Sequence, residues 1–237
     1  GNGNGPTGFP ECWKLYHEVV EFSDRILLHG PSGTGKTRQG LASGLRNDQC
    51  AYHLILTEET PAAEVRGFWA PAANGLQWQD GPAVAAWRNG GRLVLDELDH
   101  ASGDVMSLLM AIVDAQETGR ITLPNGETVQ PATGFSVIAT MNGNPEQLPP
   151  ALRDRFTVTI EIDAVHPAAL AALPAEIRNA AGATALLPAE RRLSVRSWVQ
   201  FAHLRTSVSE HTAAAAVFGR ARAQDVLDAL RLAVAEG

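Results

Sequence analysis

The chain has 237 residues, of which 45% are apolar and 19% are charged, and its formal net charge is −7. This length suits one large domain or a core domain with a smaller one, and the composition is that of an ordinary globular protein. The acidic balance argues against a general nucleic-acid-binding role. No apolar run approaches the roughly 18 residues that a membrane-spanning helix needs.

Two cysteines, Cys12 and Cys50, lack the spacing of metal ligands and favour a reducing compartment. No signal peptide is visible, so the expected location is cytoplasmic, without membrane insertion. The start of the chain is rich in Gly and Asn and contains no Met. We expect residues 1–9 to be a disordered N-terminal segment or the remnant of a tag.

The apolar patterns predict alternating strands and helices, as in an α/β fold with parallel strands. In chain order, the expected elements are helix 9–23, strand 24–29, helix 37–45, strand 51–56, a helix interrupted by a hairpin within 57–91, helix 83–88, strand 92–97, helix 102–116, hairpin 119–129, strand 135–140, helical turn 148–156 and strand 157–162. Asn74-Gly75 and Asn125-Gly126 supply the hairpin turns. After Asp163 the chain becomes rich in Ala and Leu, with helices expected over 167–180, 194–205, 212–223 and 223–236.

A glycine-rich loop joins the first strand to the next helix. It fits G-x-x-x-x-G-K-[ST], in which glycines let backbone N–H groups point inward and cradle phosphate oxygens. We expect Lys36 to reach the β- and γ-phosphates of a nucleotide and the Thr37 hydroxyl to bind Mg²⁺. The expected nucleotide-binding residues are Gly30, Pro31, Ser32, Gly33, Thr34, Gly35, Lys36 and Thr37.

Two adjacent acids end the strand at 92–97. Because neighbouring residues of a strand point to opposite sides, Asp96 can approach a metal ion, mostly through water, while Glu97 activates the attacking water. The later strand 135–140 leads to Asn142, whose amide is expected to contact the γ-phosphate or that water.

Three arginines complete the candidate site. Arg153 and Arg155 follow two prolines, in a position from which they could reach the nucleotide of a neighbouring subunit more easily than their own. Arg196 lies near the start of an expected helix, where a positive charge opposes the helix dipole and a phosphate contact would explain it.

The order of these parts resembles that of a MoxR-like AAA+ ATPase, in the helix-2-insert group that also contains CbbQ, NorQ and McrB. Residues 30–37 resemble its Walker A loop and residues 93–97 its Walker B strand. Residues 140–142 resemble sensor 1, residues 151–156 the arginine-finger segment, with Arg155 the better match, and residues 193–196 sensor 2. The resemblance implies an α/β P-loop NTPase with a five-stranded parallel sheet sandwiched by helices, plus a small C-terminal helical lid.

The resemblance also implies domain bounds: a nucleotide-binding core over 10–164 and a helical lid over 165–237. Within the core, residues 67–81 resemble the helix-2 insert and residues 120–130 the pre-sensor 1 hairpin. Both would face a pore or a partner. The insert's aromatic residues can alternatively pack onto the core: Phe68, Trp69 and Trp78.

The implied function is hydrolysis of Mg-ATP in a ring, expected to be a hexamer, coupled to remodelling, activation or cofactor insertion of a protein client. A von Willebrand A adaptor on another chain would fit the family. The alternatives are a McrB-like or other nucleic-acid-associated motor, which could prefer GTP, and a nucleotide-gated scaffold that does not cycle. Acidic charge makes nucleic acid the less favoured partner.

Overall fold

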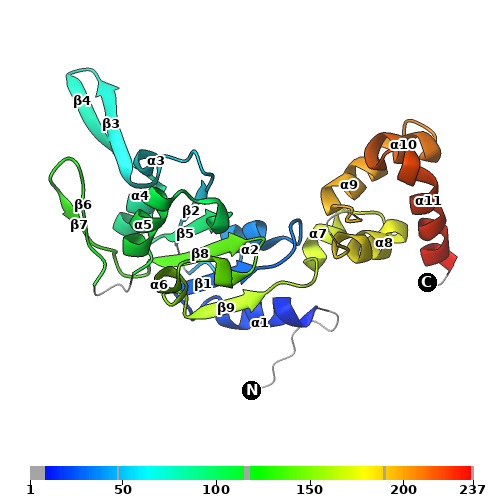
Figure 1. Cartoon of the computed structure of the whole chain (residues 1–237), viewed down its shortest axis with the longest axis horizontal. Coiled ribbons are helices and arrows are strands. Elements are labelled where there is room, and N and C mark those ends of the chain that lie inside the picture. Colours follow the sequence, from blue (N-terminus) through cyan, green and yellow to red (C-terminus); the bar gives the residue numbers. More distant parts are fainter. Residues whose placement is uncertain (1–8, 47, 115–117, 189–190, 236–237) are drawn as a thin grey trace. The chain divides into compact units, whose positions relative to one another are not determined.

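The computed structural model describes residues 9–46, 48–114, 118–188 and 191–235 (Figure 1). The described residues fall into two compact units. The sheet unit comprises residues 15–30 and 36–161, and the helical unit comprises the described residues of 1–14, 31–35 and 162–237.

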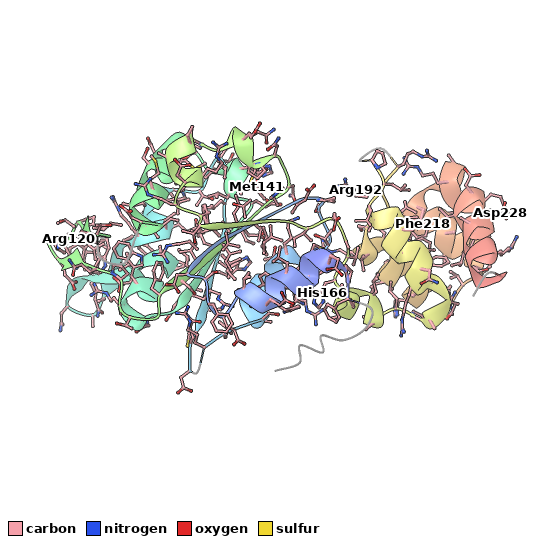
Figure 2. The ribbon with its side chains drawn as sticks, turned by 90° about the horizontal axis from the view of Figure 1, so that it is seen from below. Arg120, Met141, His166, Arg192, Phe218 and Asp228 are labelled. Atoms are coloured by element: carbon pink, nitrogen blue, oxygen red, sulfur yellow. The ribbon has the colours of Figure 1, made fainter. Side chains whose placement is uncertain are left out.

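Five parallel strands form the centre of the sheet unit, in the order β2-β5-β8-β1-β9. Their bounds are β1 Arg25–His29, β2 Ala51–Ile55, β5 Arg92–Asp96, β8 Ser136–Met141 and β9 Val158–Glu161. The three inner strands are almost wholly buried because helices cover both faces. Met141, the last residue of β8, lies among the packed side chains of this unit (Figure 2). The predicted five-stranded parallel sheet is confirmed.

Alternate residues of β5 face different helices. Leu93 and Leu95 share a core cluster with Trp87 of α4, whereas a Cβ on Gly40 of α2 would lie 3.5 Å from Val94. The helices are α1 Glu11–Val19, α2 Lys36–Ala42, α3 Ala62–Arg66, α4 Pro82–Asn89, α5 Gly103–Ile112 and α6 Pro150–Arg153, with short 3₁₀ turns η1 Leu98–His100 and η2 Pro145–Gln147.

Two buried arginines bind backbone carbonyls at the ends of helices α2 and α5, both of which end earlier than the sequence predicts. Arg92 donates to the carbonyls of Gly40, Ser43 and Gly44 at the end of α2, and burial lowers its pKa. Arg25 donates to the carbonyls of Val113 and Asp114, both at 2.8 Å, after α5. Each guanidinium satisfies carbonyls that a helix end leaves unpaired. The expected last residues of α5, 115 and 116, lie outside the described residues.

Two hairpins project from the sheet unit on the same side (Figure 1). The first pairs β3 Gly67–Ala72 with β4 Gly75–Asp80, and its turn residues are Ala73 and Asn74, one position before the predicted Asn74-Gly75. The second pairs β6 Ile121–Thr122 with β7 Thr128–Val129, around the predicted Asn125-Gly126.

The aromatic side chains of the first hairpin differ in burial. Trp78 packs against the core cluster, and its ring makes an edge-to-face contact with Trp69 at 5.7 Å. Phe68 and Trp69 are 45% and 46% exposed. The hairpin therefore keeps one aromatic on the core and presents two to solvent.

The helical unit contains α7 Pro167–Ala171, α8 Ala175–Ala185, α9 Val195–Leu204, α10 Glu210–Phe218 and α11 Arg220–Ala235. The prediction of one helix over 167–180 is wrong, because Pro174 disfavours helical backbone at the residue before it and starts a new helix. Gly219, at φ 90°, separates α10 from α11. The rings of Trp198, Phe201 and Phe218 contact one another in the core of this unit, and Figure 2 labels Phe218. Residue 236, the expected end of the last helix, lies outside the described residues.

Candidate functional site

Three strand ends supply the candidate site within the sheet unit. Strands β5, β8 and β1 are neighbours and run parallel, so their carboxyl ends meet at one edge of the sheet. The glycine-rich loop follows β1, Asp96 ends β5, and Asn142 follows β8. Segments far apart in the chain are therefore brought together by the topology.

Lys36 joins two of these segments. The residue is only 5% exposed, and its Nζ donates to the carbonyl of Gly30 at 2.8 Å and to Oδ1 of Asn142 at 3.2 Å. Both of these oxygens are neutral hydrogen-bond acceptors. The structure thus brings the predicted phosphate-binding lysine into contact with the predicted sensor amide.

One carboxylate oxygen of Asp96 accepts two hydrogen bonds from hydroxyl groups. The Thr37 hydroxyl donates to Oδ1 at 2.6 Å, and the Thr140 hydroxyl donates to the same atom. A carboxylate beside a hydroxyl is a set of hard oxygen atoms of the kind that Mg²⁺ binds, directly or through water. The sequence predicted Thr37 and Asp96 as residues of the metal site but gave Thr140 no role. The feature that could have indicated Thr140 is its position at a strand end, two residues before Asn142.

Glu97 does not continue the strand. Its backbone is left-handed, with φ 58° and ψ 48°, a region that residues other than Gly seldom occupy. The Glu97 side chain is 40% exposed and its Oε2 lies 3.6 Å from Nδ1 of His100. Asp96 and Glu97 are therefore separated by a backbone turn rather than by the strand alternation that we expected.

His53 approaches Asp96 from the edge strand β2. Its Nε2 lies 3.7 Å from Oδ2 of Asp96. Ile55 is the register partner of Asp96, and His53 lies two residues earlier, on the same face of β2. The sequence did not indicate His53, because a lone histidine in a short strand carries no motif.

The glycine-rich loop has the backbone that phosphate binding needs. Gly33 and Gly35 have φ values of 81° and 106°, which favour glycine, and a Cβ on Gly33 would meet nothing within 4 Å. The Thr34 hydroxyl donates to the carbonyl of Pro31 at 3.0 Å, and the carbonyl of Thr34 accepts from the His166 N–H at 2.8 Å. Residues 31–35 and His166 belong to the helical unit, so the hydrogen bond between Thr34 and His166 lies within that unit.

Arg155 lies at the opposite end of β1 from the loop. Its Nε is 3.7 Å from Oδ1 of Asp114, whose carbonyl accepts from Arg25, the first residue of β1. At roughly 3.3 Å per residue, β1 places about 13 Å between Arg25 and His29, where the loop begins. Arg155 is thus far from the phosphate side of its own unit.

The side chain of Arg153 makes no hydrogen bond or ion pair within the described part of the chain, whereas the Arg155 side chain also donates to the carbonyl of Ala151. Arg196 is the second residue of α9 and is exposed. The Ser194 hydroxyl caps that helix by accepting from the N–H of Ser197 at 3.0 Å. Arg196 belongs to the helical unit, so the structure does not relate it to Lys36 or Asp96.

Across the described ranges, no group of three or more His, Cys, Asp and Glu side chains is arranged to hold a metal ion. The donor set at the strand ends nonetheless fits a nucleotide with one divalent cation. It combines a buried ammonium at Lys36, oxygen atoms at Thr37 and Asp96, and an amide at Asn142. In the same ranges, no helix has both the length and the apolar character to cross a membrane.

Comparison with known proteins gives one family over most of the sheet unit: the profile described as an AAA domain of the dynein-related subfamily matches residues 25–156. Protein NorQ of Paracoccus denitrificans is 33% identical over 179 residues, covering 70% of this chain and 64% of that protein. The denitrification regulatory protein NirQ of Pseudomonas aeruginosa is 32% identical over 171 residues, covering 69% and 64%. The chain thus spans under two thirds of these relatives' length.

A solved structure of NtrX from Brucella abortus in complex with ADP has a similar fold, with a TM-score of 0.59 and 17% identity, over 82% of this chain and 48% of that one. At that identity the likeness concerns the fold alone. In that NtrX structure, the protein is in complex with ADP.

Proposed function

The chain belongs to the dynein-related AAA family and is a MoxR-like AAA+ ATPase, and we propose that it couples Mg-ATP hydrolysis in a ring oligomer to remodelling, activation or cofactor insertion of a partner protein. One observation carries the proposal. At a single edge of the sheet, one hydrogen bond joins Lys36 to Asn142 and another joins Thr37 to Asp96. Those groups suit the binding of Mg-ATP.

Each residue has a proposed role. The loop amides and Lys36 bind the phosphates, and Asn142 positions the γ-phosphate or the attacking water. Glu97 orients that water and accepts its proton. Thr37 and Asp96 hold Mg²⁺, which when bound offsets phosphate charge. The hydrogen bond from Lys36 to Asn142 supports this arrangement, because it fixes the amide beside the phosphate-binding cation.

The site is proposed to be completed by a neighbouring subunit. Arg155 or Arg153 would supply the positive charge that stabilises the transferring phosphoryl group. Arg155 lies at the end of β1 opposite the loop, and the strand between those ends is about 13 Å long, which supports a role in trans. A hexameric ring is the expected assembly. We further propose that the helical unit is the lid, with Arg196 reading the γ-phosphate.

The client is proposed to be a protein. One of the similar proteins, NirQ of Pseudomonas aeruginosa, is named a denitrification regulatory protein. A von Willebrand A adaptor on another chain would fit the family. A nucleic-acid motor is the alternative, and a Glu97→Gln trap purified with ATP from the native host distinguishes them. Recovery of an adaptor or client supports the proposal, and recovery of DNA or a nuclease contradicts it.

Subunit mixing tests the composite site. Glu97→Gln lacks the base but keeps both arginines, and Arg155→Ala keeps the base but lacks one arginine. Each variant alone should lose about 10³-fold in turnover. A mixture should regain activity, because some interfaces combine an intact Glu97 with an intact Arg155. Arg153→Ala is run in parallel, and the arginine whose variant fails alone and recovers in the mixture is the finger.

A further inference from the structure

The two oxygens of Asp96 have different surroundings. Oδ1 accepts hydroxyl hydrogen bonds from Thr37 and Thr140, whereas Oδ2 faces Nε2 of His53 at 3.7 Å. The side chains of His53 and Asp96 are 33% and 19% exposed, so water reaches both. The proposed hydrolysis uses Asp96 but leaves His53 without a role.

The separation is too long for a direct hydrogen bond but short enough for one water molecule to contact both atoms. Nitrogen–oxygen hydrogen bonds are about 2.9 Å long, and a polar gap wider than about 3.5 Å is commonly bridged by water. A neutral imidazole with its proton on Nδ1 presents Nε2 as an acceptor. A water between His53 and Asp96 can therefore donate one proton to each.

We propose that His53 is a positioning residue of the divalent-cation site. Nε2 of His53 and Oδ2 of Asp96 together hold one water of the cation's hydration shell, while Thr37 and Thr140 hold the other oxygen of Asp96 in place. Mg²⁺ gives up its waters reluctantly and is often bound through them. The proposal rests on the proposed function, since it needs a cation bound with nucleotide.

A hydrogen-bond partner outside the ligands themselves commonly changes metal affinity by about 10- to 100-fold. His53 should therefore affect the cation more than the nucleotide. It should also be replaceable by another acceptor of similar reach. These two expectations separate positioning of a water from a general packing role of the β2 side chain.

The test uses the full chain, Mn²⁺ as the probe and a non-hydrolysable ATP analogue, with free Mn²⁺ followed by electron paramagnetic resonance. His53→Ala should weaken Mn²⁺ binding about 10-fold or more. His53→Gln, whose amide oxygen can accept, should recover most of the loss. The matched control is Ile55→Ala, which removes an exposed apolar side chain from the same face of β2 and should leave Mn²⁺ affinity unchanged.

A second measurement, binding of the analogue in excess chelator, should be the same for wild type and His53→Ala. Unchanged Mn²⁺ affinity in His53→Ala would overturn the inference while leaving the proposed function intact. An equal loss of metal-free nucleotide binding would also overturn it, because His53 would then act through the fold. A wild-type chain that binds no Mn²⁺ with the analogue would overturn the proposed function as well.

Discussion

Arg88 and Glu127 are joined by two parallel N–H···O bonds of 2.6 and 2.7 Å. The Nε of the same guanidinium donates to Asp80 at 2.5 Å, and Asp80 also accepts from the indole N–H of Trp78. Asp80 ends the β3–β4 hairpin and Glu127 precedes β7. One side chain on α4 therefore links the two hairpins that project from the sheet unit.

Arg88→Ala should loosen both hairpins at once. Hydrogen–deuterium exchange should rise in β3–β4 and in β6–β7, because both carboxylates lose their partner. The effect should shrink in high salt, since exposed charge pairs are screened. Asp80→Asn and Glu127→Gln are one-sided controls, each expected to act mainly on its own hairpin. Exchange that rises in neither hairpin would show that the guanidinium does not hold them.

The link between Arg88 and Glu127 should depend on pH. Hydrogen bonds from Arg88 hold the pKa of Glu127 below its ordinary value of 4.5. A lowered folded-state pKa means that the stabilisation is complete above pH 4.5 and is lost as the pH falls through the lowered value. The difference in exchange between wild type and Arg88→Ala should thus be large at pH 7 and shrink as the pH falls below 4.5. A difference that stays the same at every pH below 4.5 would contradict this.

Glu97→Gly should make the protein more stable and inactive. A left-handed backbone costs a residue with a Cβ about 1 kcal/mol, and glycine avoids that cost. We expect the free energy of unfolding to rise by up to about 1 kcal/mol while turnover falls by about 10³-fold or more. Glu97→Ala is the control, since it removes the carboxylate but keeps the Cβ. Calorimetry and ATPase assays measure the two effects, and equal stability of both variants would argue against backbone strain.

Thr140→Val should affect the cation site without disturbing the strand. Valine has nearly the same shape, but it cannot donate to Asp96. We expect nucleotide binding in chelator to stay near wild type and the Mn²⁺ affinity to fall about 10-fold. Thr37→Val should lose more, because Thr37 is the proposed ligand itself. An affinity unchanged in Thr140→Val would show that Asp96 keeps its orientation without that hydroxyl.

Gly81→Ala should destabilise the base of the first hairpin. A Cβ there would lie 2.6 Å from the carbonyl oxygens of both Glu64 and Val65. Backbone oxygens cannot turn away as a side chain can, so we expect a loss of about 1–3 kcal/mol in the free energy of unfolding. Gly103→Ala is the matched control, because a Cβ there would meet nothing within 4 Å. Thermal unfolding of the two variants gives the comparison.

The features of the fold and the site that the sequence could predict are those that depend on local patterns of residues. The phosphate-binding pattern at 30–37 and the apolar runs of the strands depend on neighbouring residues, and the parallel sheet follows from their order. Asp96 and Asn142 could be named because Asp96 ends one buried strand and Asn142 follows another. In a parallel sheet such positions meet at one edge.

The parts that sequence could not predict depend on contacts between distant residues. His53 and Arg88 carry no motif, and their roles follow from neighbours 43 and 39 positions away in Asp96 and Glu127. The left-handed backbone at Glu97 is unusual for its residue type, so propensity argued against it. Helix α7 ended early because one proline outweighed a favourable Ala/Leu composition.

The ion pair between Arg155 and Asp114 has a consequence for assembly if Arg155 is the finger. An isolated subunit already supplies an anion for that guanidinium. The phosphate of a nucleotide on the neighbouring subunit must then compete with Asp114 for the Arg155 guanidinium. Each new interface therefore replaces one anion beside Arg155 by another. A lone subunit would then keep Arg155 paired with its own Asp114 and would stay inactive. The guanidinium would move to ATP only when the neighbouring subunit has bound.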